Sequence, residues 1–502
     1  MRTAVLVCDH LPAAEGLCCD LAAGLAEVVA QVVPRLCRQP RQMAAPLRAA
    51  APQRLVLGLC APVQDVAEMQ AQARAAGLDA LGVEVVLLEG AGARAPLLLA
   101  AAVARARAFA GSTPAQAKLY LSAQLSRRSL LRLSLPVYGA APSIDPERCA
   151  AEAGCQACVQ VCPQGALAWE DGRVRYDKAR CEPCGLCVTA CPRGAITNPA
   201  ATPAQLEAQV RTLLDPARGT LWPRGLVFTC QQAPPALAAW HPGWLPVALP
   251  CVAMAPPAWL LAPLLLGAGA VGVLPCAEGC RRGQEERIAA RVAYSQAFLQ
   301  ALGAPAERVS LCAALDRPPP AGEAPLPLVA PFAAGATARV LAALAARYGA
   351  PADLVLEHAA SPLGVIEVRQ AACTGCGRCA LSCPTGALVF AQQAQGVTLS
   401  FDATLCVACG QCLPRCPEAG AIALRRRTDL GRLAQGRQVV YREATARCQA
   451  CGAAIAPQAM LRRLAALLGP ELAATAALLG KYCPDCRPLA SPAGLHRSGE
   501  KA

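Results

Sequence analysis

The sequence predicts a multidomain chain of α+β and α/β units, and three features carry that prediction. At 502 residues, 55% of them hydrophobic, the chain is too long for a single core and has ample material for several. In two regions, short β-branched or leucine-rich runs alternate with alanine-rich helical stretches, as in small parallel α/β domains. Most of the 30 cysteines are gathered in closely spaced runs outside these two regions.

The first α/β region spans residues 1–112. Strands are predicted at 3–8, 54–59 and 83–88, with helical segments at 63–76 and 95–109. This alternation favours a small parallel sheet covered by helices. Residues 113–141 are expected to form a connector of helix and loop.

Two tandem cysteine motifs occupy residues 142–199, and a second pair occupies residues 364–425. Three closely spaced thiolates can hold one [4Fe–4S] cubane, whereas a fourth, directly before a proline, ligates the neighbouring cluster. Zinc or redox-active dithiols are the alternatives, but the spacing favours iron. The sequence therefore predicts four clusters, held by Cys149, Cys155, Cys158 and Cys191; by Cys162, Cys181, Cys184 and Cys187; by Cys373, Cys376, Cys379 and Cys416; and by Cys383, Cys406, Cys409 and Cys412.

Both regions resemble bacterial 2[4Fe–4S] ferredoxins. The first departs from the usual run, with five residues instead of two between Cys149 and Cys155. The resemblance implies two compact electron-transfer units, and their similarity to each other indicates an internal duplication.

The second α/β region spans residues 222–315, with strands predicted at 225–230, 271–274 and 309–312 and helices at 256–266 and 284–303. The sequences GLVFTC, LPC and GAGAVGVLPCAEGCRRGQEERIAARV resemble the delta subunit of methyl-viologen-reducing hydrogenases. That resemblance implies a [2Fe–2S] centre, and buried structural thiols are the alternative. The candidate ligands follow predicted strands, where ligands assemble in parallel sheets: Cys230, Cys251, Cys276 and Cys280.

The same region contains a literal GxGxxG at residues 267–272. A dinucleotide fingerprint must follow a strand and open a helix. This one follows a predicted helix and opens a predicted strand, so we do not expect a dinucleotide site.

Cysteines also end two of the predicted strands in the N-terminal region. VLVC at 5–8, RLC at 35–37 and LGLCAP at 57–62 resemble the N-terminal domain of the flavin-containing component of heterodisulfide reductases, although its large flavin domain has no counterpart here. The resemblance implies an additional cluster at Cys8, Cys37 and Cys60, and a merely structural domain is the alternative. The fourth ligand stays open among three residues: His10, Cys18 and Cys19.

The C-terminal region, residues 440–490, carries two CxxC pairs on either side of an amphipathic segment at 457–479. Four thiolates in two such turns suit tetrahedral Zn²⁺, so we expect a zinc-ribbon-like domain. A redox dithiol pair or a fifth cubane is the alternative. The residues are Cys448, Cys451, Cys483 and Cys486. Residues 316–363 are expected to be a proline-rich linker with a helix at 335–348.

The N-terminus enters an apolar strand without a leading basic region, so we expect no signal peptide and a reducing, cytoplasmic compartment. The twin-arginine sequence at 126–132 lies far inside the chain and is expected to belong to an amphipathic helix. The uncharged stretch 242–276 is interrupted by prolines, which argues against a membrane span. The net charge of +13 comes almost entirely from scattered arginines, which favours acidic redox partner proteins over nucleic acid.

The sequence predicts an electron-transfer protein that works as a subunit or partner of a cytoplasmic dehydrogenase, hydrogenase or heterodisulfide-reductase-like enzyme. No catalytic residues are expected, because the four histidines are too scattered for a histidine-based site. An assembly or maturation factor for a redox enzyme is one alternative. A redox-sensing regulator acting through nucleic acid is the other.

Overall fold

A computed structural model describes residues 1–110, 140–231, 233, 235–276, 283–312, 315–393 and 395–490. It divides into two compact units. The first comprises residues 1–149, 157–169 and 174–350, and the second comprises residues 150–156, 170–173 and those from 351 onward. The expected connector at 113–141, including the twin-arginine sequence, falls almost entirely outside the described residues.

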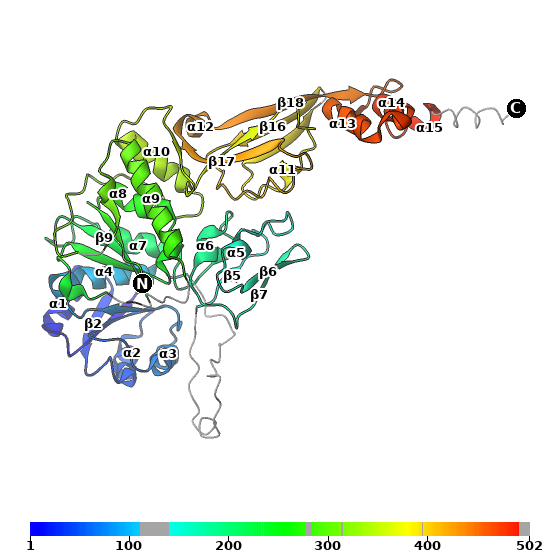
Figure 1. Cartoon of the computed structure of the whole chain (residues 1–502). Coiled ribbons are helices and arrows are strands. Elements are labelled where there is room, and N and C mark those ends of the chain that lie inside the picture. Colours follow the sequence, from blue (N-terminus) through cyan, green and yellow to red (C-terminus); the bar gives the residue numbers. More distant parts are fainter. Residues whose placement is uncertain are drawn as a thin grey trace. The chain divides into compact units, whose positions relative to one another are not determined.

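The N-terminal residues form a parallel sheet with the strand order β2-β1-β3-β4 (Figure 1, blue). Three of its strands are the expected ones: β1 (Thr3–Cys8), β3 (Arg54–Leu59) and β4 (Val83–Leu87). The fourth strand, β2 (Val28–Val33), was not predicted, because Ala30 and Gln31 interrupt its valines. All six residues of β1 are buried, as expected for a central parallel strand covered on both faces.

Helices and short 3₁₀ turns surround this sheet. They are α1 (Ala14–Gly24), η1 (Pro40–Met43), α2 (Ala44–Ala50), α3 (Val66–Ala75), η2 (Gly92–Arg94) and α4 (Ala95–Arg107). Helix α4 packs on β3 and β4 and also against α7 (Pro203–Leu213). Its leucines and alanines are buried along most of its length, since it has partners on more than one side.

The first cysteine-rich region consists of short elements joined by cysteine-bearing loops. Strands β5 (Ser143–Ile144) and β8 (Ile196–Thr197) pair antiparallel, and β6 (Leu167–Glu170) forms a two-stranded sheet with β7 (Arg173–Tyr176). Helices α5 (Ala157–Gln160) and α6 (Leu186–Ala190) pack on each other.

A second parallel sheet follows, with the order β10-β9-β11-β12. Its strands are β9 (Gly225–Cys230), β10 (Trp244–Leu249), β11 (Val271–Val273) and β12 (Val309–Leu311). Helix α8 (Pro257–Leu265) is buried at every residue and leads into β11, so the uncharged stretch is a strand, a buried helix and a strand. The GxGxxG sequence therefore follows a helix and opens a strand, as predicted. Helix α9 (Glu285–Ala301) precedes β12.

Buried arginines connect the two parallel sheets within the first unit. The Arg94 guanidinium donates hydrogen bonds to the carbonyl oxygens of Leu237 (2.6 Å) and Trp244 (3.4 Å). Arg105 on α4 pairs with Glu84 at 3.0 Å and donates to the Ala200 carbonyl at 2.7 Å. Because each guanidinium has several hydrogen-bond acceptors, the cost of burying its charge is offset by fixed hydrogen bonds.

The proline-rich segment after β12 lies along the second sheet's domain instead of forming a free linker. The Leu326 amide donates to the Leu265 carbonyl at 2.8 Å, and Glu323 pairs with Arg308 at 2.8 Å. A Cβ on Gly269 would lie 1.7 Å from the Pro320 carbonyl oxygen, so this approach requires glycine. Helix α10 (Thr337–Arg347) then packs on α8.

The second unit contains two antiparallel sheets. One has the order β13-β17-β14, formed by β13 (Val355–Glu357), β14 (Gly364–Val368) and β17 (Ile422–Asp429). The other has the order β15-β16-β18-β19, formed by β15 (Leu388–Gln393), β16 (Gly396–Asp402), β18 (Arg437–Arg447) and β19 (Ala454–Pro457). Short helices α11 (Arg378–Leu381) and α12 (Leu430–Gln435) complete the region.

The amphipathic segment near the C-terminus is broken into α13 (Gln458–Leu468), η6 (Pro470–Leu472) and α14 (Ala473–Lys481), with α15 (Arg487–Ala490) after it. The break falls at Gly469, which has φ +71°, followed by proline. Within the described ranges, no single helix has the length and apolar character needed to cross a membrane. Among the described helices, the pair 458–468 and 470–481 meets these criteria when its two members are taken together, although they are bent by 114°.

Candidate metal centres

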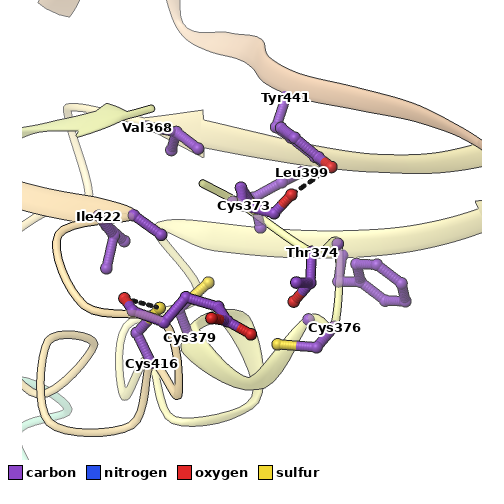
Figure 2. A pocket seen from close by; sticks show the side chains of 14 residues that line it. Val368, Cys373, Thr374, Cys376, Cys379, Leu399, Cys416, Ile422 and Tyr441 are labelled. Carbon is purple, nitrogen blue, oxygen red and sulfur yellow. Dashed lines mark hydrogen bonds between the residues drawn. The ribbon is translucent and has the colours of Figure 1, made fainter. Parts of the chain in front are cut away.

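Cysteines from different motifs meet at three cavities. One cavity in the second unit is lined by Cys373, Cys376, Cys379 and Cys416 (Figure 2), and another by Cys383, Cys406, Cys409 and Cys412. A third cavity, in the first unit, is lined by Cys162, Cys181, Cys184 and Cys187. Each cavity thus collects three cysteines of one motif and the cysteine before proline of its neighbour. The remaining set, Cys149, Cys155, Cys158 and Cys191, stays a prediction.

Glycines in the left-handed region shape the turn that carries Cys373, Cys376 and Cys379. Gly375 has φ +67° and Gly377 has φ +72°. A Cβ on Gly377 would lie 2.7 Å from the Phe390 ring. Position 377 therefore requires glycine for two reasons: the positive φ angle and the closeness of the Phe390 ring.

The surroundings of the cavities are apolar, which raises the pKa of the thiols. Burial, together with neighbouring thiols, raises the pKa of Cys412 to about 12 and that of Cys187 to about 12. Burial likewise raises the pKa of Cys379 to about 11. Desolvation penalises the ionised form of a thiol. Four thiolates can therefore line one such apolar cavity only when metal ions supply positive charge.

Backbone amides point at two of the sulfur atoms that precede prolines. The Ala166 amide donates to Cys162 Sγ at 3.3 Å, and the Ala195 amide donates to Cys191 Sγ at 3.2 Å. Both bonds span four residues, so the local Cys-Pro turn produces them. Hydrogen bonds to ligand sulfur are one of the means by which a protein sets the reduction potential of a cluster.

The donor set fits an iron–sulfur cluster: four thiols in an apolar nest, with N–H donors aimed at sulfur where the turns allow it. Two family models match the chain, each described as a 4Fe-4S dicluster domain, at residues 141–192 and 372–421. None of the curated proteins compared with the chain matches it. The site and these matches define the class: an iron–sulfur protein. More particularly, the chain carries two 4Fe-4S dicluster domains.

Tyr441 belongs to the first of these cavities although it lies beyond the matched residues. Its hydroxyl donates to the Cys373 carbonyl at 2.8 Å, and its ring is fully buried on β18 (Figure 2). Burial raises the pKa of Tyr441, so the hydroxyl remains a donor at neutral pH. Nothing in the local cysteine spacing identified this residue.

We expect Tyr441→Ala to raise the midpoint potential of one cluster and to lower the free energy of unfolding by about 4 kcal/mol. Removing the ring admits water, which stabilises the extra negative charge of the reduced state. Tyr441→Phe is the matched control: it keeps the ring, loses about 1 kcal/mol with the hydrogen bond, and leaves the potential near its original value. Redox titration followed by electron paramagnetic resonance checks both variants. Equal potentials in the two would contradict water exclusion by the ring.

The candidate cysteines of the second parallel sheet lie at one edge but are only partly described. Cys230 ends β9 and is buried, its thiol lying 3.6 Å from the Pro250 carbonyl oxygen, and Cys251 is buried just after β10. Cys276 follows β11, and Cys280 lies outside the described residues. Among the described residues, none of these cysteines joins a group of metal-ligand atoms within 4.8 Å of one another.

Two residues near this edge were not singled out from the sequence. Cys312 follows β12, so every strand of the sheet ends at a cysteine or has one within the next three residues, a regularity that the sequence contains. Arg291 on α9 donates to the Ala255 carbonyl at 2.9 Å and interacts electrostatically with Cys251. Partial burial lowers the pKa of Arg291 to about 10, so it remains a cation beside that thiol.

The two C-terminal CxxC pairs meet. Cys448, Cys451, Cys483 and Cys486 place their sulfur atoms within 4.8 Å of one another, and Cys451 Sγ lies 3.6 Å from Cys483 Sγ. One pair turns between β18 and β19, and the other follows α14. Backbone hydrogen bonds, led by the one from Cys483, lower the pKa of Cys448 to about 6, which favours the thiolate that a metal ion needs.

In the N-terminal domain, Cys8, Cys37 and Cys60 meet His10. The other two candidates for the fourth ligand belong to α1 and are not in this group. Cys18 is buried in that helix and Cys19 is exposed on it.

Proposed function

We propose that the chain relays single electrons, as a subunit or partner of a cytoplasmic dehydrogenase, hydrogenase or heterodisulfide-reductase-like enzyme. The observation that carries this proposal is the crossed grouping of cysteines, in which each cavity draws thiols from two motifs. Such grouping holds two clusters close together in one small domain. When bound, each [4Fe–4S] cluster accepts and returns one electron. We infer four such clusters, held by the sixteen cysteines of the two dicluster domains.

The chain's own residues supply a dry and closely packed setting. Val368, Leu399 and Ile422 line the cavity of Cys373 and exclude water from it. In the first unit, α6, which carries Cys187, packs on the turn η4 (Val252–Met254) that follows Cys251. This contact supports a path between the dicluster domain and the cysteine-bearing edge of the second sheet.

The looser resemblances fit the same role. In the second parallel sheet a cysteine ends or closely follows each strand, which supports a further centre of the hydrogenase delta type at Cys230, Cys251, Cys276 and Cys280. The resemblance to the flavin-containing component of heterodisulfide reductases points to the same class of partner. We propose Zn²⁺ at the four C-terminal cysteines, because four thiolates in two CxxC turns close a tetrahedral shell. Scattered arginines would favour acidic partner proteins through long-range attraction.

Metal and electron counts on the full chain, purified without oxygen, test the proposal. We expect about sixteen irons and as many acid-labile sulfides from the two dicluster domains, with further iron if the second sheet holds a centre. A reductive titration is expected to take up about four electrons into these clusters, and a redox partner protein should remove them again. Zinc in the dicluster cysteines, with no acid-labile sulfide, would overturn the relay.

The same preparation separates the other two roles. An assembly factor would pass its iron and sulfide to an apo-protein and emerge depleted. A regulator would bind DNA with an affinity that falls steeply as salt is raised. A relay keeps its metal through repeated cycles of reduction and oxidation and shows neither behaviour.

A further inference from the structure

Four ligand atoms in the N-terminal domain lie at the corners of a nearly regular tetrahedron. The Sγ atoms of Cys8, Cys37 and Cys60 are 3.5–3.7 Å apart. His10 Nδ1 lies 3.6 Å from each of the three sulfur atoms. All six edges are therefore equal within 0.2 Å. The sulfur–sulfur distances are too long for a disulfide.

These edges have the size of a site for one metal ion. The centre of a regular tetrahedron with edges near 3.6 Å lies about 2.2 Å from each corner, which matches Zn–S bonds of about 2.3 Å and Zn–N bonds of about 2.0 Å. Three thiolates and one imidazole are a usual zinc donor set. Four protein ligands fill the shell and leave no position for a substrate.

The dicluster cysteines provide an internal comparison. All sixteen are described, and none belongs to a group of ligand atoms within 4.8 Å of one another. Twelve of them line three cavities instead, as expected where a cubane of irons and sulfides must fit between the thiolates. The N-terminal thiols leave no such space between them.

The fold brings these ligands together from three neighbouring strands. Cys8 ends β1, Cys37 lies in the loop after β2, and Cys60 directly follows β3. Strands β2 and β3 lie on either side of β1 in the sheet. The Gln64 amide donates to the Cys37 carbonyl at 3.2 Å and ties two of the ligand loops together.

Asp9 holds the other side of the site. Its Oδ1 atom accepts a hydrogen bond from the Arg35 amide at 2.7 Å and lies 3.9 Å from His10 Nε2. The carboxylate thus faces the imidazole nitrogen opposite the one aimed at the sulfur atoms. At 3.9 Å the carboxylate lies beside this nitrogen without accepting a direct hydrogen bond from it.

The geometry points to a mononuclear Zn²⁺ site formed by Cys8, His10, Cys37 and Cys60, in place of an iron–sulfur cluster. The ion clamps the carboxyl ends of the strands together at the edge of the first sheet. This inference stands apart from the relay, because it concerns a closed shell without electron transfer.

Elemental analysis and the rate of zinc release to a chelator, measured on the full chain and on four variants, test the inference. Cys60→Ser is expected to lose one zinc per chain while its iron and sulfide contents stay unchanged. His10→Ala, an exposed change, is expected to release that zinc to a chelator at least about tenfold faster, and His10→Cys is expected to restore retention. The matched control, Cys19→Ser, changes an exposed cysteine of the same domain and should keep every metal.

Two results would overturn the inference. One is a loss of about four irons from Cys60→Ser with zinc unchanged, which would mean a cubane. The other is no loss of zinc from Cys60→Ser together with no faster release of zinc from His10→Ala. Should Cys60→Ser fail to fold, the surface pair His10→Ala and His10→Cys still decides the question.

Discussion

Cys412→Ala is expected to remove about four irons per chain and to leave the other clusters in place. Cys412 lines the cavity of Cys383, Cys406 and Cys409, and it packs against the hydrophobic core of its domain. The ligands of the neighbouring cavity in that domain keep their own core contacts, so their cluster should persist. Iron and sulfide analysis, with cluster-specific electron paramagnetic resonance, measures the loss.

The matched control for this prediction is Cys19→Ala, which removes an exposed thiol remote in sequence and outside every cavity described above. It should keep the full iron content. If Cys412→Ala lost all the iron of its domain, the two cavities would be one cooperative unit. If it lost none, Cys412 would not be a cluster ligand.

Gly377→Ala is expected to prevent assembly of the cluster at Cys373, Cys376, Cys379 and Cys416. The left-handed backbone, with φ +72°, costs an alanine about 1–2 kcal/mol. Its Cβ would also lie within 3.0 Å of the Phe390 ring, which lines the same cavity. The turn must therefore shift, and Cys376 and Cys379 shift with it.

Gly386→Ala separates the two causes. Gly386 has a similar dihedral angle, φ +68°, but a Cβ there meets nothing within 4 Å. This variant should lose only the backbone cost of about 1–2 kcal/mol and keep its iron. Iron content and thermal unfolding under anaerobic conditions compare the two. Equal iron content in both variants would show that the contact with Phe390 does not govern assembly.

Much of the fold was predictable because its signals are local. The strands β1, β3 and β9 coincide with the predicted apolar runs, and α8 begins at a proline and ends two residues before Gly267. β2 was missed since its apolar run is interrupted by Ala30 and Gln31. The segment after β12 was expected to be a linker, whereas backbone hydrogen bonds and close contacts hold it to the second sheet's domain.

The metal ligands, too, were predictable from the sequence only in part. The spacing within the motifs predicted which cysteines line three of the cavities, because turns of fixed length direct neighbouring thiols to one point. Spacing left His10, Cys18 and Cys19 equal as a fourth ligand, since each lies close to Cys8 in the chain. The end of β1 directs His10 to the thiols, whereas α1 holds the two cysteines elsewhere.

By itself, the sequence determined that this chain has motifs for iron–sulfur clusters, and it determined which cysteines share a turn. Only the tertiary structure brought Tyr441 to Cys373, 68 residues away, and placed Cys8, Cys37 and Cys60 at one tetrahedron with His10. The physical reason is distance along the chain. Short turns fix ligand geometry through backbone dihedral angles, whereas contacts between distant segments depend on how strands and helices pack.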